Sequence, residues 1–155
     1  MKATYRVLAY LVALGVVVQA AAIAFAYFGL GKWIEDGGVL DKATMESEGT
    51  GFTGVVGFMI HGIAGEMVIP AIALILLVVS FFAKVPGGVL WAGIVVVLTV
   101  LQVALGLLGF AVVGLGLLHG VNALAMFAVA AMAAHRAVTR TAPQHAAAPD
   151  RARAT

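Results

Sequence analysis

Four apolar stretches, each long enough to cross a lipid bilayer, dominate this sequence of 155 residues. They span roughly residues 7–30, 52–82, 88–113 and 116–135, and a helix needs about 20 apolar residues to cross the hydrocarbon core. Hydrophobic residues make up 63% of the chain and charged residues only 10%, which is too little polar surface for a water-soluble domain. The sequence therefore predicts an all-α integral membrane four-helix bundle, with residues 1–138 as the membrane domain.

The distribution of basic residues predicts how the helices cross the membrane, because cytoplasmic loops are enriched in Lys and Arg. The loop from Gly31 to Gly51 is acidic and is predicted to lie outside. The basic residues on the opposite side are Lys2, Arg6, Lys84, Arg136, Arg140, Arg151 and Arg153. Both termini are therefore predicted to be cytoplasmic, in a multi-pass protein of a bacterial plasma membrane. Residues 139–155 are rich in Ala, Pro and Arg and are predicted to form a disordered cytoplasmic tail.

Composition also excludes several classes of function. The chain has no cysteine, which rules out disulfides, thiolate-bound iron–sulfur clusters and covalent c-type haem. The basic residues flank membrane helices, so nucleic-acid binding is not predicted. Neither a nucleotide-binding glycine loop nor a hydrolase motif is present, and no stand-alone enzymatic activity is predicted. Small residues at Ala92 and Gly93 are compatible with a homo-oligomer and equally with lipid contact.

Two histidines, His61 and His119, stand inside the second and fourth apolar stretches. An ionisable residue is costly there and often marks a functional site. At 1.5 Å per residue, they lie about 12–14 Å and about 5 Å below the outer ends of their helices, both in the outer half of the bilayer. Two imidazoles that face each other across a bundle can serve as the axial ligands of one iron. The pair therefore predicts a b-type haem, with His61 and His119 as its metal ligands.

Small and polar residues near the histidines are the remaining candidates for haem contact. Gly57 and Gly65 share a helical face with His61 and are predicted to leave room for a flat ligand. Gly106 belongs to a similar small-residue stripe on the third stretch, and Asn122 lies on the histidine-bearing face of the fourth. The alternative is that these small residues simply allow close helix packing in lipid.

Glu66 is the other ionisable residue inside a predicted helix, where a carboxylate costs about 2.5–3.5 kcal/mol on insertion scales. Gln19 and Gln102 lie at similar depth, so the three side chains are predicted to form a buried polar layer below the haem. Glu66 is expected to be neutral or to exchange protons, with a structural polar clamp as the alternative. A rotation of about 140° separates it from His61, which argues against a shared mononuclear iron or zinc site.

The outer loop and its flanks carry residues suited to complete a haem site. Trp33 and Phe52 are aromatic and lie beside the predicted membrane surface, which makes them candidates to cap the pocket. Lys32 and Lys42 are candidates to pair with haem propionates that point outward.

The run Leu101-Gln102-Val103-Ala104-Leu105-Gly106, followed by Leu117-Leu118-His119, resembles the third and fourth helices of one half of heme A synthase. In that family each half has four helices, with haem-facing histidines on the second and fourth. The resemblance covers about residues 7–135 and implies a haem between His61 and His119. The chain also resembles small four-helix membrane proteins of actinobacteria, which implies no activity.

This chain departs from the heme A synthase pattern at two points. The catalytic half of the family carries a glutamate three residues before its first histidine, and that position is Phe58 here. The cysteine pair found in the outer loop of many members is absent. The resemblance therefore implies haem binding by a single half, without oxidation of the haem.

Together, these features predict a haem b protein of the lipid bilayer that transfers electrons, with quinone or a redox protein as its partner. A second hypothesis is a cofactor-free accessory or scaffold subunit, in which interhelical hydrogen bonds to residues such as Gln102 or Asn122 satisfy both histidines. A third is a small transporter or channel subunit that uses Glu66. Haem absorbance distinguishes the first hypothesis from the other two.

Overall fold

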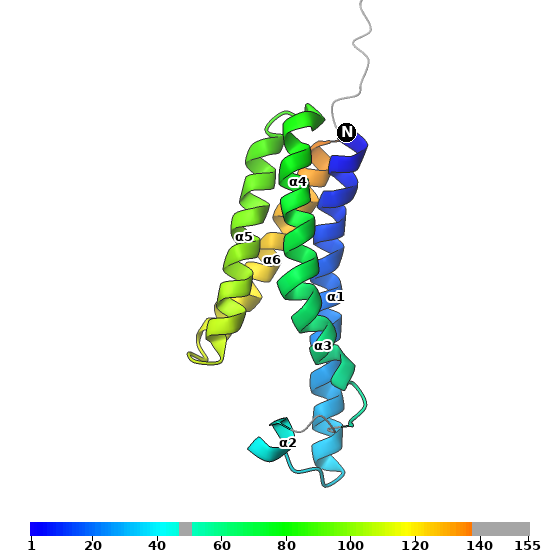
Figure 1. Cartoon of the computed structure of the whole chain (residues 1–155), viewed down its shortest axis with the longest axis vertical. Coiled ribbons are helices and arrows are strands. Elements are labelled where there is room, and N and C mark those ends of the chain that lie inside the picture. Colours follow the sequence, from blue (N-terminus) through cyan, green and yellow to red (C-terminus); the bar gives the residue numbers. More distant parts are fainter. Residues whose placement is uncertain (47–50, 138–155) are drawn as a thin grey trace, which may run out of the picture.

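The computed structural model describes residues 1–46 and 51–137, so the predicted tail of residues 139–155 lies outside the described part of the chain. The described residues form helices joined by short turns and loops (Figure 1). Four of the helical segments are long and apolar enough to cross a membrane: α1 (Lys2–Glu35), Val55–Ala83, α5 (Gly88–Gly109) and α6 (Leu115–Arg136). The predicted all-α fold with four long apolar helices is confirmed.

The first helix is the longest and extends well past α5 and α6 (Figure 1). Its 34 residues correspond to about 51 Å, whereas the hydrocarbon core is about 30 Å thick. A short helix that was not predicted, α2 (Lys42–Glu46), follows in the loop after α1. The Thr44 backbone N–H donates to the Asp41 carboxylate at 2.7 Å, and this bond holds the pKa of Asp41 below its ordinary value.

The second apolar helix is not a uniform α-helix. It consists of α3 (Val55–Ile63), a π-helical turn η1 (Ala64–Val68) and α4 (Ile69–Ala83). Within η1 the hydrogen bonds shift from four residues back to five, as in the bond from the Ile69 N–H to the Ala64 carbonyl. Pro70 follows directly and has no N–H, so the Glu66 carbonyl lacks its usual α-helical donor. The wide turn of η1 thus directly precedes a position at which proline breaks the α-helical hydrogen-bond pattern.

The long helices pack in the cyclic order α1, α4, α5, α6, so that each contacts two neighbours. We call α1 with α3–η1–α4 the first hairpin, and α5 with α6 the second hairpin. The main core lies in the half of the bundle near the start of α1, where the largest fully buried side chains are Tyr5, Val12, Leu76 and Val95. In the other half of the bundle, α3 packs against α1. The end of α5 and the start of α6, which a turn connects, diverge there from α1 and α3 (Figure 1).

Candidate functional site

The two intramembrane histidines meet at the level where the two hairpins diverge. His61 on α3 and His119 on α6 have ring centroids 6.1 Å apart, with an angle of 57° between the ring planes. Both residues are half-buried. Two imidazoles that each bind one metal ion through a ring nitrogen at about 2 Å have centroids about 6 Å apart. The separation therefore fits a pair of histidines that share one metal ion.

Both histidine rings are anchored in the same way. Nδ1 of His61 lies 3.2 Å from the main-chain oxygen of Gln19, and Nδ1 of His119 lies 3.0 Å from the main-chain oxygen of Gln102. A carbonyl oxygen can only accept, so Nδ1 carries the proton and donates in both rings. Nε2 is then the basic nitrogen of each histidine. Metal-bound histidines usually have this arrangement, in which the second ring nitrogen donates to a carbonyl or carboxylate.

In the second hairpin, the polar side chains form a closed network. The Gln102 amide nitrogen donates to Nε2 of His119 at 3.1 Å. Its amide oxygen accepts a bond of 2.6 Å from Asn122, which also donates to the Leu98 carbonyl at 2.9 Å. Asn122, predicted to contact a haem, is buried here and orients Gln102. Gln102 is thus the hydrogen-bond partner of both ring nitrogens of His119.

The polar side chains of the first hairpin make fewer hydrogen bonds than those of the second. The Gln19 amide donates to the Ile60 carbonyl at 3.4 Å, close to the π-helical turn. That carbonyl also accepts from the Ala64 N–H, which is shared between Ile60 and His61 at the end of α3. Within the described residues, Nε2 of His61 has no hydrogen-bond partner. The first hairpin therefore leaves one basic nitrogen available.

The three glycines that were predicted to border a haem pack against protein groups. A Cβ at Gly57 would overlap a main-chain carbonyl of α1, and one at Gly65 would lie 3.1 Å from the amide oxygen of Gln19. A Cβ at Gly106 would lie 3.2 Å from Cε1 of His119. The prediction that these glycines leave open space for a flat ligand is therefore wrong, because α1 and the His119 ring occupy that space.

Glu66 does not join the two glutamines. It lies in η1 with an exposed side chain, and it has no hydrogen-bond or ion-pair partner within the part of the chain that the structure describes. Gln19 and Gln102 are instead engaged within their own hairpins. The predicted buried layer of these three side chains does not form. No group of three or more His, Cys, Asp or Glu residues suited to a metal ion occurs within residues 1–46 and 51–137.

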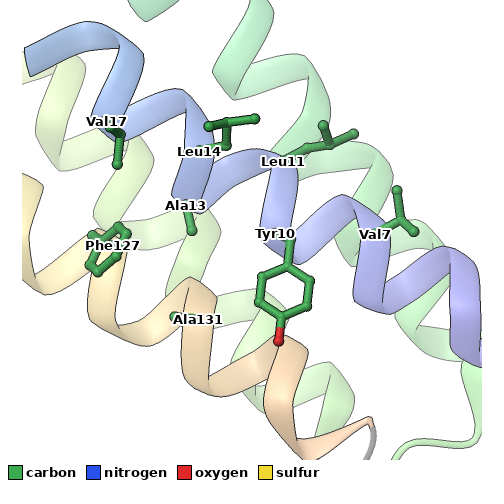
Figure 2. A pocket seen from close by; sticks show the side chains of 8 residues that line it. All are labelled: Val7, Tyr10, Leu11, Ala13, Leu14, Val17, Phe127 and Ala131. Atoms are coloured by element: carbon green, nitrogen blue, oxygen red, sulfur yellow. The ribbon is translucent and has the colours of Figure 1, made fainter. Parts of the chain in front are cut away.

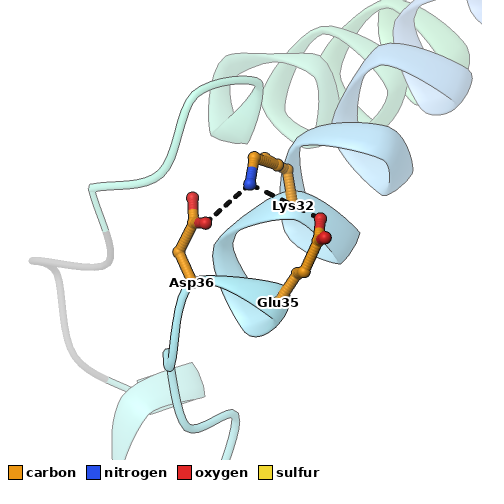
Figure 3. A network of polar contacts seen from close by, with 3 residues as sticks. All are labelled: Lys32, Glu35 and Asp36. Carbon is orange, nitrogen blue, oxygen red and sulfur yellow. Dashed lines mark hydrogen bonds and ion pairs between the residues drawn. The ribbon is translucent and has the colours of Figure 1, made fainter.

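Lys32 is already paired near the C-terminal end of α1 (Figure 3). Its ammonium group lies 2.6 Å from a carboxylate oxygen of Asp36 and 3.4 Å from one of Glu35. These are local pairs at spacings of four and three residues on an exposed helix end. The prediction that Lys32 pairs with a haem propionate is therefore not supported, because two carboxylates already neutralise its charge.

The predicted capping aromatics contact each other where α1 ends and α3 begins. The Trp33 and Phe52 ring centroids are 6.0 Å apart, and Phe52 continues to Phe58 at 6.3 Å. Phe58 in turn packs edge-on against Tyr27 at 5.4 Å. This series of rings holds the start of α3 against α1, one turn of helix from His61. Its role as a cap over a cofactor stays a prediction.

The anchoring main-chain carbonyls of Gln19 and Gln102 were not predicted from the sequence. The sequence feature that indicates this paired arrangement is an internal repeat. Ile60-His61-Gly62 on the second apolar helix matches Leu118-His119-Gly120 on the fourth, and each preceding helix contains one glutamine. The two hairpins therefore present the same Gln and His residue types in the same order.

Comparison with protein-family models, with curated proteins and with solved structures yields no significant match. The resemblance to one half of heme A synthase therefore stays a prediction.

Proposed function

We propose that this chain is a haem b protein of the membrane that transfers electrons, with His61 and His119 as the two axial ligands. The proposal rests on the two imidazole rings of His61 and His119, whose centroids are 6.1 Å apart. Each ring donates a hydrogen bond from Nδ1–H to a main-chain carbonyl oxygen. Haem supplies one-electron redox chemistry when bound. The carbonyls of Gln19 and Gln102 hold the imidazoles in the Nδ1–H tautomer and increase the basicity of Nε2.

Haem binding requires a local change at His119. Its Nε2 accepts a hydrogen bond from Gln102, so this amide has to turn away before the nitrogen can bind iron. The loss of one interhelical hydrogen bond costs about 0.6–2 kcal/mol in a membrane. His61 requires no such exchange. Contact between α3 and the second hairpin is small, so the region around His61 is not tightly packed against α5 and α6.

The proposed setting is the plasma membrane of a bacterium, with both termini in the cytoplasm. The described basic residues at the N-terminal end of the bundle, Lys2, Arg6, Lys84 and Arg136, support this orientation. The histidine pair then lies in the outer half of the bilayer. A quinone within the membrane or a redox protein at its surface is the proposed electron partner.

A cofactor-free accessory or scaffold subunit is the second candidate. The closed network of His119, Gln102 and Asn122 favours it, because both ring nitrogens of His119, both amide atoms of Gln102 and the Asn122 amide nitrogen have partners without any ligand. In that case the histidines would hold each hairpin together. The transporter hypothesis gains no comparable support, since Glu66 is exposed and has no polar partner among the described residues.

The test is an optical spectrum of the full chain, purified in mild detergent from haem-replete cells and recorded air-oxidised and dithionite-reduced. We expect sharp reduced α and β bands, lost in both His61→Ala and His119→Ala. His135→Ala is the matched control, because this histidine is exposed near the end of α6, and it should retain both bands. A flat spectrum under conditions that load a known cytochrome would overturn the proposal in favour of the accessory subunit.

A further inference from the structure

An apolar groove of about 430 Å³ lies between α1 and α6 on the side of the bundle, toward the start of α1 (Figure 2). It lies in the opposite half of the bundle from the diverging ends of the hairpins. Its α1 wall includes Val7, Tyr10, Leu14 and Val17, and its α6 wall consists of Phe127 and Ala131.

The length of the groove matches one leaflet of a bilayer. Ten residues separate Val7 from Val17, which corresponds to about 15 Å along α1. This is half of the hydrocarbon core, whose thickness is about 30 Å. A lipid acyl chain that runs parallel to the helices fits a channel of this length and apolar character.

A polar and basic strip continues the groove toward the end of the bundle. The Tyr10 ring extends from α1 toward α6, with its hydroxyl at the C-terminal part of α6 (Figure 2). Arg6 and Lys2 precede Tyr10 at spacings of four residues, so the three residues share one face of α1. Toward the start of α1, the apolar lining is thus followed by the Tyr10 hydroxyl and then by the positive charges of Arg6 and Lys2.

The positive charge at this end has no matching negative charge in the described part of the chain. The described carboxylate residues lie in η1 or at the opposite end of α1 and the loop that follows it. Arg136, which also lies at this end, packs over the Trp91 ring at 4.6 Å. An anionic group at the membrane surface is therefore the complementary partner for Arg6 and Lys2.

We propose that this groove is a binding site for an anionic phospholipid of the membrane leaflet that surrounds the first half of α1. One acyl chain lies along the groove against residues such as Leu14, Val17 and Phe127. The phosphate pairs with Arg6 and Lys2, and the Tyr10 hydroxyl donates to a phosphate or ester oxygen. A zwitterionic lipid has the same chains, but its own cation already neutralises its phosphate, so it binds more weakly. The site does not depend on haem binding.

The experiment is native mass spectrometry of the full chain in detergent, with phosphatidylglycerol or phosphatidylcholine of identical acyl chains added. We expect phosphatidylglycerol to be retained preferentially. Arg6→Gln and Lys2→Gln should each weaken this binding about fivefold. Lys32→Gln removes one positive charge at the opposite end of α1 and should leave binding unchanged.

A second pair of variants tests the groove itself. Ala131→Phe fills the groove and should reduce phosphatidylglycerol binding while the basic residues stay intact. Ala128→Phe adds the same bulk at an exposed position of α6 outside the groove and should have no effect. Equal retention of both lipids, or no effect of Ala131→Phe in a folded chain, would overturn the proposal. A dimer that Ala131→Phe dissociates would identify a second copy as the occupant and would also overturn it.

Discussion

The two hairpins hold their histidines by the same bond but differ in what surrounds that bond. In the second hairpin, His119, Gln102 and Asn122 form a closed network with distances of 2.6–3.1 Å. In the first hairpin, the Gln19 amide reaches only the Ile60 carbonyl at 3.4 Å, and Nε2 of His61 stays unpaired within the described residues. One hairpin satisfies its polar groups internally, and the other leaves a ligand atom available.

The difference follows from helix geometry. Both helices of the second hairpin are regular, so contacts repeat every three or four residues along them: Thr99 with Met126, Gln102 with Asn122 and His119, and Gly106 with His119. In the first hairpin, η1 inserts a wider turn just after His61. Gln19 consequently lies beside His61, Ile60 and Gly65, and within the described residues its amide has no side-chain partner. A regular pair of helices allows a complete polar network, and a π-helical turn interrupts it.

The largest expected effect is at Gly57, where the first hairpin depends on close approach of α3 to α1. In Gly57→Ala the new methyl group would overlap a main-chain carbonyl, which cannot move aside as a side chain can. We expect a loss of about 2 kcal/mol in the free energy of unfolding. The measurement is unfolding of the purified chain in mixed micelles with increasing SDS, followed by circular dichroism.

The control for this variant is Gly62→Ala, five residues further along the same helix. A Cβ at Gly62 meets no heavy atom within 4 Å, and alanine is the better helix former. This substitution should leave stability unchanged or slightly raised. If both variants lost the same amount, the close α1–α3 contact would not be the feature that stabilises the first hairpin.

The second prediction compares the polar contacts of the two hairpins directly. Asn122→Leu keeps the number and branching of the side-chain heavy atoms but leaves the Gln102 amide oxygen unpaired, and we expect it to cost about 1–2 kcal/mol of unfolding free energy. Gln19→Leu removes only the bond of 3.4 Å to a carbonyl that has another donor, so we expect about 0.6 kcal/mol or less. The same SDS titration measures both. Equal costs would contradict the distinction between a closed and an open hairpin.

Much of the fold follows from the sequence because apolar length alone defines membrane helices. The structure confirms four long apolar helices, and it brings together the two histidines that the spacing placed in the same half of the bilayer. The pairing of Lys32 with Glu35 and Asp36 also follows from spacings of three and four residues, and these local pairs compete with the predicted pairing to a haem propionate.

The contacts of the small residues could not be predicted in the same way. Glycine at Gly57 or Gly106 suits either a flat ligand or a close helix neighbour, and spacing alone does not distinguish the two. The position of Glu66 depends on η1, because an α-helical projection assigns the wrong face to residues within a π-helical turn. Side-chain polarity likewise does not identify main-chain acceptors such as the Gln19 and Gln102 carbonyls.

The smallest expected effect is spectroscopic and concerns the tautomers of the two histidines. In the haem-free chain labelled with ¹⁵N-histidine, both His61 and His119 should give the Nδ1–H pattern, because each donates to a carbonyl. Nε2 of His119 should carry the additional shift of a nitrogen that accepts a hydrogen bond, and Nε2 of His61 should not. Exposed His135 provides the reference signal for a ring in contact with solvent or detergent. An Nε2–H tautomer at either histidine would show that its Nδ1 does not donate to the glutamine carbonyl. The main support for two histidines as paired axial ligands would then be lost.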